Sequence, residues 1–501
     1  MTEPVVRPEH LDVVIVGAGL SGIGAAYRLQ TACRGKTYAI VEARDSLGGT
    51  WDLFRYPGIR SDSDMFTLGY PFKPWRAAES IADGPSILRY ITETATDYDI
   101  DRHIRFRTKV RCADWSSRTA RWTLTLEHRD ATGGTELSTL TCGFLYACAG
   151  YYDYDQPYTP EFSGISTFSG RVVHPQFWPE DIDYAGKRVV VIGSGATAVT
   201  LVPAMAEQAE SVTMVQRSPT WISPVPGRDK QADKIRELLP PRLAHRVIRI
   251  KNILFTIGFY QYCRRRPDSA RKLLTGLATR ILKDDKAVAE HFTPSYNPWD
   301  QRLCAAPDAD FFKAMRRGTA EVVTDHIESF VPEGIRLKSG RVLAADIVIT
   351  ATGLQLLAFG GIDLTVDDAA VELSEQFVWQ GTMITGVPNF AVCIGYTNAS
   401  WTLRADLTSR LVCKVLDHMD RKDYAAVVPQ PQGALDEHPL LDLASGYIRR
   451  SIAEFPRQGA RHPWKVRQNY LLDSAMTLRT DLNKTLTPTP RSAVGQPVRI
   501  S

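Results

Sequence analysis

Two short stretches have the spacing of turns that hold a dinucleotide. They follow the pattern G-x-G-x-x-G/A, with the fixed positions Gly17, Gly19 and Gly22 in the first and Gly193, Gly195 and Ala198 in the second. The first glycine permits a tight bend, the second lets the backbone approach a pyrophosphate, and the third position allows close helix–strand packing. The helix that follows offers free N–H groups to the phosphates. A chain that holds two dinucleotides can pass electrons between them, so the pattern predicts redox chemistry.

The residue that ends the strand after each turn indicates which dinucleotide is held. Glu42 stands 20 residues after Gly22, where a carboxylate accepts hydrogen bonds from ribose hydroxyls. At the corresponding place after the second turn stands Arg217, which suits a ribose 2′-phosphate. The first turn therefore suits a dinucleotide with free ribose hydroxyls, such as FAD, and the second suits NADPH in preference to NADH, with Arg217 holding the phosphate.

Each turn lies in a strand–helix–strand pattern of the kind that builds a Rossmann-like fold. Apolar, β-branched runs predict strands over residues 11–16, 38–41, 144–150, 187–192, 212–215 and 346–353. A helix is expected over residues 23–30, and another from the second turn through residue 205. The fold class is therefore α/β, with two Rossmann-like dinucleotide-binding domains.

The domain division follows from the strand-like runs that end in glycine. In oxidoreductases with two dinucleotides, such strands mark the crossings between a flavin domain and an inserted nicotinamide domain. We expect an FAD-binding domain made of residues 1–149 and 346–501, and an NADPH-binding domain over 150–345 with a helical insertion at about 225–295. The composition of the tail after Lys484 predicts disorder.

Bulk composition narrows the class of protein. The 501 residues carry a net charge of +4, with 44% hydrophobic and 23% charged residues, which is typical of a soluble globular protein and gives no reason to expect nucleic-acid binding. Eight scattered cysteines form no CxxC pair, so we expect no metal site and reduced thiols in a cytoplasm. The polar N-terminus is neither a signal nor a transit peptide, and no apolar run approaches the roughly 20 residues of a membrane-spanning helix.

Residues 48–62 could fold over a flat cofactor ring. Gly49 and the glycine before it would let the backbone pass close to a flavin, and Trp51 and Tyr56 would supply flat apolar walls. The run is too polar and glycine-rich for a helix, so we expect a loop, which ends at Asp62.

Two motifs together carry a family resemblance. Residues 48–62 match [A/G]GxWxxxx[F/Y]P[G/M]xxxD, and a segment between the two turns matches F-x-G-x-x-x-H-x-x-x-W-P through Phe168, Gly170, His174, Trp178 and Pro179. On these motifs the chain resembles the type I Baeyer–Villiger monooxygenases over about residues 11–469. The resemblance implies the flavin-monooxygenase architecture and a small-molecule substrate together with O2.

The resemblance also implies a reaction and its residues. NADPH reduces FAD, O2 forms a C4a-peroxyflavin, and this converts a ketone to an ester or oxygenates the sulfur of thioethers and of thioamides of the ethionamide type. Arg302 corresponds to the family's active-site arginine and Asp62 to its carboxylate partner, with Gly49 and Trp51 beside the flavin. A peroxide anion needs a fixed cation facing it and exclusion of water.

Other positions have roles that rest on the same resemblance. The signature residue His174, with the rest of its motif, is expected on an interdomain linker that couples the domains. Gln301 stands where many relatives have a lysine that helps hold the 2′-phosphate, so that grip would depend more on Arg217. Independently of the resemblance, Cys304 is expected to be a packing residue, because no histidine or helix-start cue suggests an activated thiol. The residues expected along the substrate cavity are Asn398, Ser400 and Trp401.

Alternative functions stay open at this point. One is an N- or S-oxygenating flavin monooxygenase without significant Baeyer–Villiger activity. Another is a flavin disulfide reductase, which needs a redox CxxC or CxxxxC pair that the chain lacks. A non-enzymatic flavoprotein scaffold would not need Arg302 and Asp62.

Residues 242–283 form a basic stretch with two interpretations. They contain eleven Lys or Arg and one acid, Asp268, around an apolar run at 253–260. The favoured interpretation is a helical insertion that caps the substrate cleft and exposes a basic face. The other is peripheral contact with an anionic membrane surface. The sequence does not fix the oligomeric state or the physiological substrate.

Overall fold

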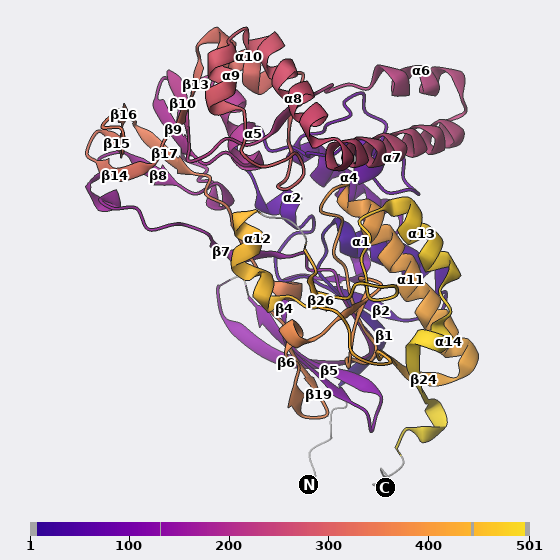
Figure 1. Ribbon diagram of the computed structural model, residues 1–501. Helices are drawn as coiled ribbons and strands as arrows, with labels where there is room; N and C mark the ends of the chain where they lie inside the picture. The colour runs from indigo at the N-terminus through magenta and orange to yellow at the C-terminus, as the bar shows by residue number, and fades with distance from the viewer. Residues whose placement is uncertain (1–7, 131, 442–444, 496–501) are drawn as a thin grey trace.

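The computed structural model describes residues 8–130, 132–441 and 445–495 (Figure 1). The FAD-side domain is built on a mixed sheet whose strand order is β20-β19-β4-β5-β6-β1-β2-β3, with β23, β22 and β21 continuing beside β6. The parallel part is β1 (Glu9–Val16), β2 (Tyr38–Val41), β3 (Ile104–Arg105), β6 (Thr135–Ala147) and β23 (Phe390–Val392). The remaining strands are β4 (Thr108–Ser116), β5 (Arg121–Arg129), β19 (Asp363–Val366), β20 (Ala369–Ala370), β21 (Val378–Trp379) and β22 (Met383–Ile384).

Alternation along β1 explains how this sheet is covered on both faces. Val13 and Ile15 point into the core that contains the helices, whereas Val14 points into the core on the other face. The helical face consists of α1 (Leu20–Ala32), α3 (Met65–Leu68), α4 (Gly84–Asp97) and α11 (Trp401–Lys422). The expected strands at 11–16 and 38–41 and the helix after the first turn are confirmed.

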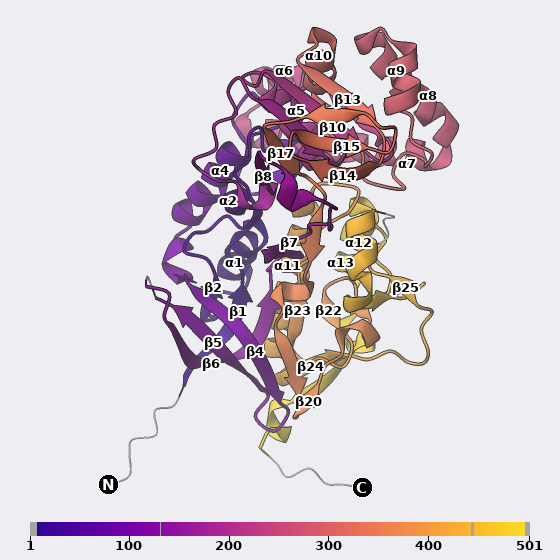
Figure 2. The same ribbon diagram turned by 90° about the vertical axis from the view of Figure 1, so that its left-hand side faces the viewer.

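The second domain lies at the opposite end of the molecule and holds a parallel sheet (Figures 1 and 2). Its strand order is β13-β10-β9-β17-β8, and the strands are β8 (Arg171–Val173), β9 (Arg188–Ile192), β10 (Ser211–Gln216), β13 (Ala320–Thr324) and β17 (Ile347–Thr350). Helices α5 (Ala196–Met205) and α10 (Asp310–Arg317) pack on it. A smaller antiparallel sheet contains β14 (Ile327–Val331), β15 (Gly334–Leu337) and β16 (Val342–Ala344). Two Rossmann-like sheets are therefore present, as the sequence indicates.

The return crossing to the first domain comes later than expected. The division at residue 345 would give β17 to the FAD-side domain, but β17 pairs with β8 and β9 of the second sheet. The crossing is instead made by β18 (Leu354–Leu356), which pairs antiparallel with β7 (Tyr152–Pro157), the outward crossing. A glycine after a strand shows where that strand ends. It does not show where the chain leaves the domain.

The expected helical insertion contains α6 (Lys230–Leu238), α7 (Pro241–Arg265), α8 (Pro267–Leu282) and α9 (Asp285–His291). The inner face of α7 packs on the FAD-side core through Ala244 and Ile248, while Ala278 of α8 packs on the second domain. Within the described residues, none from 242–283 lines the large cleft described below, so these helices do not form a wall of that cleft. Residues of α7 instead line a small separate pocket together with Asn398 and Leu403. Among all residues that the structure describes, no helix is both long and apolar enough to cross a membrane.

The tail after Lys484 is ordered through residue 495, contrary to the expected disorder. Helix α14 (Leu482–Thr485) leads into β27 (Leu486–Pro490), which pairs antiparallel with β24 (Tyr424–Pro429). Leu486 is buried, and prolines are tolerated because β27 pairs on one side alone. Residues 496–501 lie outside the described part.

A buried cation on α7 fixes the insertion to the FAD-side domain. The guanidinium of Arg249 donates from Nη1 to the carbonyl oxygens of Phe66 (2.8 Å), Thr67 (3.3 Å) and Gly69 (2.8 Å), at the C-terminal end of α3. Cations are favourable at such a helix end. Because α3 follows directly on the loop that ends near Asp62, Arg249 also supports that loop.

Replacing Arg249 by methionine is expected to lower the free energy of unfolding by about 2–4 kcal/mol, because three buried carbonyl oxygens lose their donor. The measurement is urea unfolding followed by circular dichroism. Arg246→Met is the matched control, since Arg246 is exposed on the same helix, and a change within about 0.5 kcal/mol is expected there. Equal effects of the two substitutions would contradict the role of Arg249.

Candidate active site in the interdomain cleft

The first glycine-rich turn is shaped by contacts that a side chain would block. Gly17 has φ +99°, and a Cβ built on it would lie 2.9 Å from the carbonyl oxygen of Cys148. A Cβ at Gly22 would lie 1.9 Å from the carbonyl oxygen of Gly17. These two positions therefore require glycine for local packing, and Gly19 is left to face the cleft.

Glu42 lies buried at the end of β2, beside this turn. Its carboxylate accepts hydrogen bonds from the backbone N–H of Ala18 (2.7 Å) and of Arg44 (3.0 Å). Burial raises the pKa of Glu42, although these hydrogen bonds oppose that shift. The carboxylate lines the cleft with its orientation fixed by the backbone, as a ribose-binding acid requires.

In the second turn, too, one glycine is required by local packing and another faces open space. Gly193 has φ +126°, and a Cβ on it would lie 2.2 Å from the carbonyl oxygen of Ala351. Among the described residues, no atom beyond those of the adjacent residues of the chain lies within 4 Å of the Cβ position of Gly195, so this place is open to a ligand. Ala198 is fully buried against the sheet. Arg217 is exposed on the cleft lining and has no hydrogen-bond or ion-pair partner among the described residues.

The helices behind the two turns begin without a side-chain cap. Helix α1 starts after Gly19 and α5 after Gly195, and neither turn offers a side-chain acceptor to the first N–H groups. Other helices of the chain do have such a cap: α4 begins at Asp83, α6 at Asp229 and α9 at Asp284. The N–H groups of α1 and α5 thus face the cleft with their positive partial charge, which fits a pyrophosphate at each.

The segment 48–62 touches both turns. Gly49 has φ +57°, and a Cβ built on it would lie 3.2 Å from Gly19 Cα. Gly58 has φ +74°, and a Cβ built on it would lie 2.7 Å from Ala204 Cβ of α5. Trp51 lines the cleft. The expectation of a loop needs a correction, because the one-turn helix α2 (Thr50–Leu53) begins directly after Gly49.

Arg302 and Asp62, 240 residues apart in sequence, form an ion pair in the cleft. Arg302 Nε lies 3.2 Å from Asp62 Oδ2, and 36% of the arginine side chain is exposed, against 16% for the aspartate. Burial opposes the charge of Arg302, but Asp62, with nearby tyrosines, outweighs it and raises the pKa of Arg302. An ion pair between Arg60 and Asp310 fixes the same loop to α10 of the second domain.

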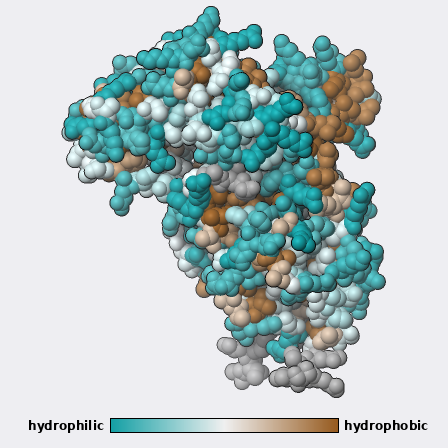
Figure 3. Space-filling view, in the orientation of Figure 1, coloured by the Kyte–Doolittle hydropathy of each residue, from teal (hydrophilic) through white to brown (hydrophobic). Residues whose placement is uncertain are grey.

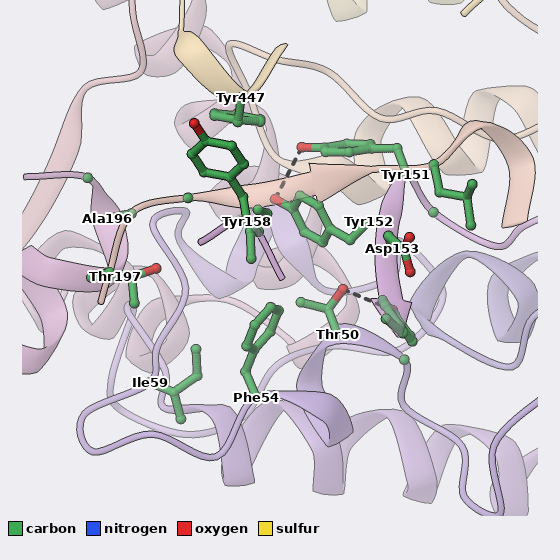
Figure 4. Close-up of a pocket in the computed structure, with 18 of the residues that line it drawn as sticks. Thr50, Phe54, Ile59, Tyr151, Tyr152, Asp153, Tyr158, Ala196, Thr197 and Tyr447 are labelled. Carbon is green, nitrogen blue, oxygen red and sulfur yellow. Dashed lines mark hydrogen bonds between the residues drawn. The ribbon is translucent and has the colours of Figure 1, made fainter. Parts of the chain in front are cut away.

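Tyrosines that the sequence analysis missed line the same cleft (Figure 4), and three of them interact electrostatically with Arg302. Tyr151 and Tyr152 follow the end of β6, and their hydroxyls lie 3.3 Å apart. Tyr447 of α12 (Gly446–Ser451) projects toward them from the far side of the pocket, with Tyr158 beside it. Burial raises the pKa of Tyr151, Tyr152 and Tyr447, so these phenols stay neutral near pH 7. Four tyrosines within residues 151–158 were a visible signal; Tyr447 carried none.

The cleft that joins these groups has a volume of about 1350 Å³. Its lining includes both glycine-rich turns, Glu42, Trp51, Asp62, Arg217 and Arg302. Lys338, a cation that the sequence analysis did not consider, also lines it, as does Gln301. The structure therefore brings the expected dinucleotide residues and the expected catalytic pair to one cavity.

The fingerprint segment runs along the second domain toward the crossing strands. Phe168 is buried there, and a Cβ at Gly170 would lie 2.3 Å from the carbonyl oxygen of Asp346. His174 Nδ1 accepts a hydrogen bond from the backbone N–H of Gln176 (3.2 Å), and burial lowers the pKa of His174. Gln176 Nε2 donates to the carbonyl oxygens of residues 153 and 154 in β7. The partly buried residues next along are Trp178 and Pro179.

Of the cavity residues expected from the resemblance, Trp401 alone lines the cleft among the described residues. It donates from Nε1 to Ser21 Oγ at 2.7 Å. Asn398 donates to the carbonyl oxygen of Gln468, and Ser400 forms a hydrogen bond with Thr67, and neither residue lines the large cleft. Cys304 is buried on β12 (Cys304–Pro307), and burial raises its pKa to about 12. No group of His, Cys, Asp or Glu suited to a metal occurs in the described parts of the chain.

Comparison with known proteins decides the family. The family model described as flavin-binding monooxygenase-like matches residues 78–230, and an NAD(P)-binding Rossmann-like model matches 15–78. The FAD-containing monooxygenase EthA of Mycobacterium tuberculosis (strain ATCC 25618 / H37Rv) is 53% identical over 94% of this chain and 96% of its own length. The chain belongs to the family of FAD-containing monooxygenases. This confirms the resemblance drawn from the two motifs. Because the family consists of enzymes, the alternative of a non-enzymatic flavoprotein scaffold is excluded.

Further relatives and solved structures agree with this assignment. The probable FAD-binding monooxygenase AlmA of Acinetobacter baylyi is 47% identical and covers 93% of each chain. A steroid monooxygenase bound to NADP matches with a TM-score of 0.76 at 24% identity, over 96% of this chain and 99% of that one. A polycyclic ketone monooxygenase from Thermothelomyces thermophila matches with a TM-score of 0.78 at 18% identity, over 98% and 91%. At these identities the solved structures establish the fold.

The two glycines of the second turn separate folding from binding. Gly193→Ala is expected to cost more than about 2 kcal/mol of stability, because the new methyl would meet backbone at a left-handed φ. Gly195→Ala, at φ −77° with free space around it, should leave the thermal midpoint unchanged but raise the KM for NADPH about tenfold or more, because the methyl enters the phosphate's space. Wild-type KM in a folded Gly195→Ala protein would show that no phosphate lies there.

Proposed function

We propose that the chain is an NADPH- and O2-dependent FAD monooxygenase that converts ketones to esters and oxygenates the sulfur of thioethers and of thioamides of the ethionamide type. The observation that carries this proposal is the Arg302–Asp62 ion pair in a cleft shared by two dinucleotide turns. The ketone and steroid monooxygenases among the structural neighbours support the choice of substrate class.

The residues present fit the two cofactors. The uncapped N-termini of α1 and α5 would each hold a pyrophosphate, Glu42 the ribose of FAD, and Arg217 the 2′-phosphate of NADPH. FAD, once reduced by NADPH, supplies the chemistry that activates O2. Gln301 adds no charge at its position, so Arg217 carries most of the selectivity for NADPH over NADH.

Arg302 would stabilise the negative charge that develops on oxygen during transfer. An arginine cannot lose its proton at working pH, and a partner that fixes its orientation removes the cost of reorganising it. Asp62 supplies that orientation through Arg302 Nε, which leaves the remaining N–H groups of the guanidinium for the reacting oxygen.

Water exclusion falls to the aromatic residues around the ion pair. Tyr151, Tyr152 and Tyr447 line this end of the cleft, with Phe54 of the loop across from them (Figure 4). Trp51 of the same loop also lines the cleft. Neutral phenols can donate a hydrogen bond to a substrate carbonyl without adding a competing negative charge. A shielded site also prevents wasteful release of hydrogen peroxide.

The fingerprint residues would couple the two domains and not transfer protons. His174 is neutral and held by Gln176, which in turn bonds to β7, a crossing strand. This chain of contacts links the second domain to the strand that lines the cleft. The ends of the same segment are fixed by packing of Phe168 and Trp178. Gly170 allows the backbone to approach Asp346 closely, and Pro179 directly follows Trp178.

The first test compares products formed by the wild-type enzyme and by Arg302→Ala. With aliphatic ketones, aryl ketones and thioamides, the wild type is expected to give esters and S-oxides, identified by mass spectrometry. In Arg302→Ala, ester formation should fall about 100- to 1000-fold, the usual effect of losing one fixed electrostatic partner. Reduction of the flavin by NADPH, followed by stopped-flow absorbance, should remain within a few-fold.

Arg302→Lys serves as the control, because it retains the charge but not the forked geometry, and intermediate activity is expected. An undiminished ester yield in Arg302→Ala would refute the assigned role. S-oxides without esters from the wild type would instead identify an S-oxygenating enzyme without Baeyer–Villiger activity.

The second test concerns cofactor choice. Arg217→Ala should raise the KM for NADPH about tenfold, equivalent to about 1.4 kcal/mol, with little change for NADH. Arg317→Ala, at an exposed arginine on α10, is the matched control. Equal losses for NADPH and NADH would show that Arg217 does not read the 2′-phosphate.

A further inference from the structure

Helix α7 exposes an apolar stripe on the face opposite its buried side. Leu243, Val247, Ile250 and Leu254 are spaced by four, three and four residues, so they share one side of the helix. Ile250 and Leu254 keep 57% and 52% of their surface exposed. The other side of α7 already packs on the FAD-side core, so packing within the chain does not explain the outer stripe.

Neighbouring segments extend this surface. Leu238, 80% exposed, ends α6 just before α7, and Phe255 is exposed beside Leu254. Helix α13 (Tyr470–Arg479) starts beside α7, where Tyr470 packs with Ile253, and exposes Leu471 and Leu472. Figure 3 shows hydrophobic residues gathered at the upper right, over the region of α6 and α7 in Figure 1. Contiguous apolar surface of this kind marks an interaction site.

Unpaired basic residues border the stripe. Arg242 and Arg246 lie along one edge of α7, and Arg265 and Arg266 at its C-terminal end; all are exposed, and none forms an ion pair or side-chain hydrogen bond among the described residues. Lys272 of α8 adds to them. The exposed acids nearby are Glu237 at the end of α6 and Asp268 at the start of α8. The border is therefore strongly positive.

We propose that the outer face of α7 binds an anionic lipid bilayer, with the helix lying flat in the interface. A helix of 25 residues is about 37 Å long, and such a helix with an apolar face and basic flanks inserts its apolar side a few ångströms below the headgroups. Anionic headgroups complement Arg242 and Arg246. A second copy of the same face would instead bring these like charges together.

This orientation determines which side of the molecule would face the bilayer. The inner face of α7 contacts Ala399 and Leu403, on either side of Trp401, which lines the cleft. The bilayer would therefore lie on the side of the molecule from which α11 starts. The inference does not depend on the proposed reaction, because binding to lipid is measured without substrate.

The test is co-sedimentation of the FAD-loaded enzyme with vesicles. Binding is expected to vesicles of phosphatidylcholine with a third of phosphatidylglycerol, to weaken as salt is raised, and to be absent with phosphatidylcholine alone. R242E together with R246E should weaken binding roughly 30-fold or more, since each basic residue near an anionic surface contributes about fivefold. Ile250→Ser with Leu254→Ser should weaken it about tenfold.

Matched controls lie at the other end of the molecule, around β4, β5 and β6 (Figures 1 and 2). Arg118→Glu and Leu137→Ser change an exposed arginine and an exposed leucine there, and vesicle binding should stay at the wild-type level. Retained FAD absorbance and circular dichroism verify that each variant is folded.

Two outcomes would overturn the proposal. One is wild-type binding that is absent with anionic vesicles or unchanged by reversal of Arg242 and Arg246. The other is a stable dimer in light scattering that the Ile250→Ser, Leu254→Ser variant converts to monomer, which would assign the surface to a second copy of the chain.

Discussion

The loop of residues 48–62 packs against both nucleotide-binding units at once, and the remaining geometry depends on these contacts. A Cβ on Gly49 would lie 3.2 Å from Gly19 Cα of the first turn, which is a tight contact at a left-handed φ, and a Cβ on Gly58 would lie only 2.7 Å from Ala204 of α5, the helix behind the second turn. The loop then ends at Asp62, which orients Arg302. A shift of either domain would therefore disturb the ion pair as well as the turns, so the distance between electron donor and acceptor and the position of the cation are set together.

The helical insertion supports this arrangement from outside the cleft. Arg249 fixes α7 to the carbonyl oxygens at the end of α3, directly after the loop. The insertion thus acts as a brace between the domains, and the enclosure of the ion pair falls to Tyr447 of α12 and the tyrosines after β6.

The parts of the site that are local in sequence could be predicted, because glycine spacing and strand–helix alternation reflect contacts within about 30 residues. Arg302 and Asp62 could be paired through motifs alone, since nothing local links them. Tyr447 and the carbonyl contacts of Arg249 depend on chain segments that meet only after folding. The ordering of β27 likewise required an unpaired edge on β24, and the assignment of β17 required its neighbours β8 and β9.

The N-termini of α1 and α5, which have no side-chain cap, link the supply of cofactor to the stability of the protein. Unsatisfied N–H groups at a helix end are tolerated when a phosphate arrives, and a ligand that binds the native chain alone stabilises it in proportion to the logarithm of its concentration. A cell short of riboflavin would accordingly hold this polypeptide in its least stable form and expose it to proteolysis. The stability of the folded enzyme would then vary with the concentration of its cofactors.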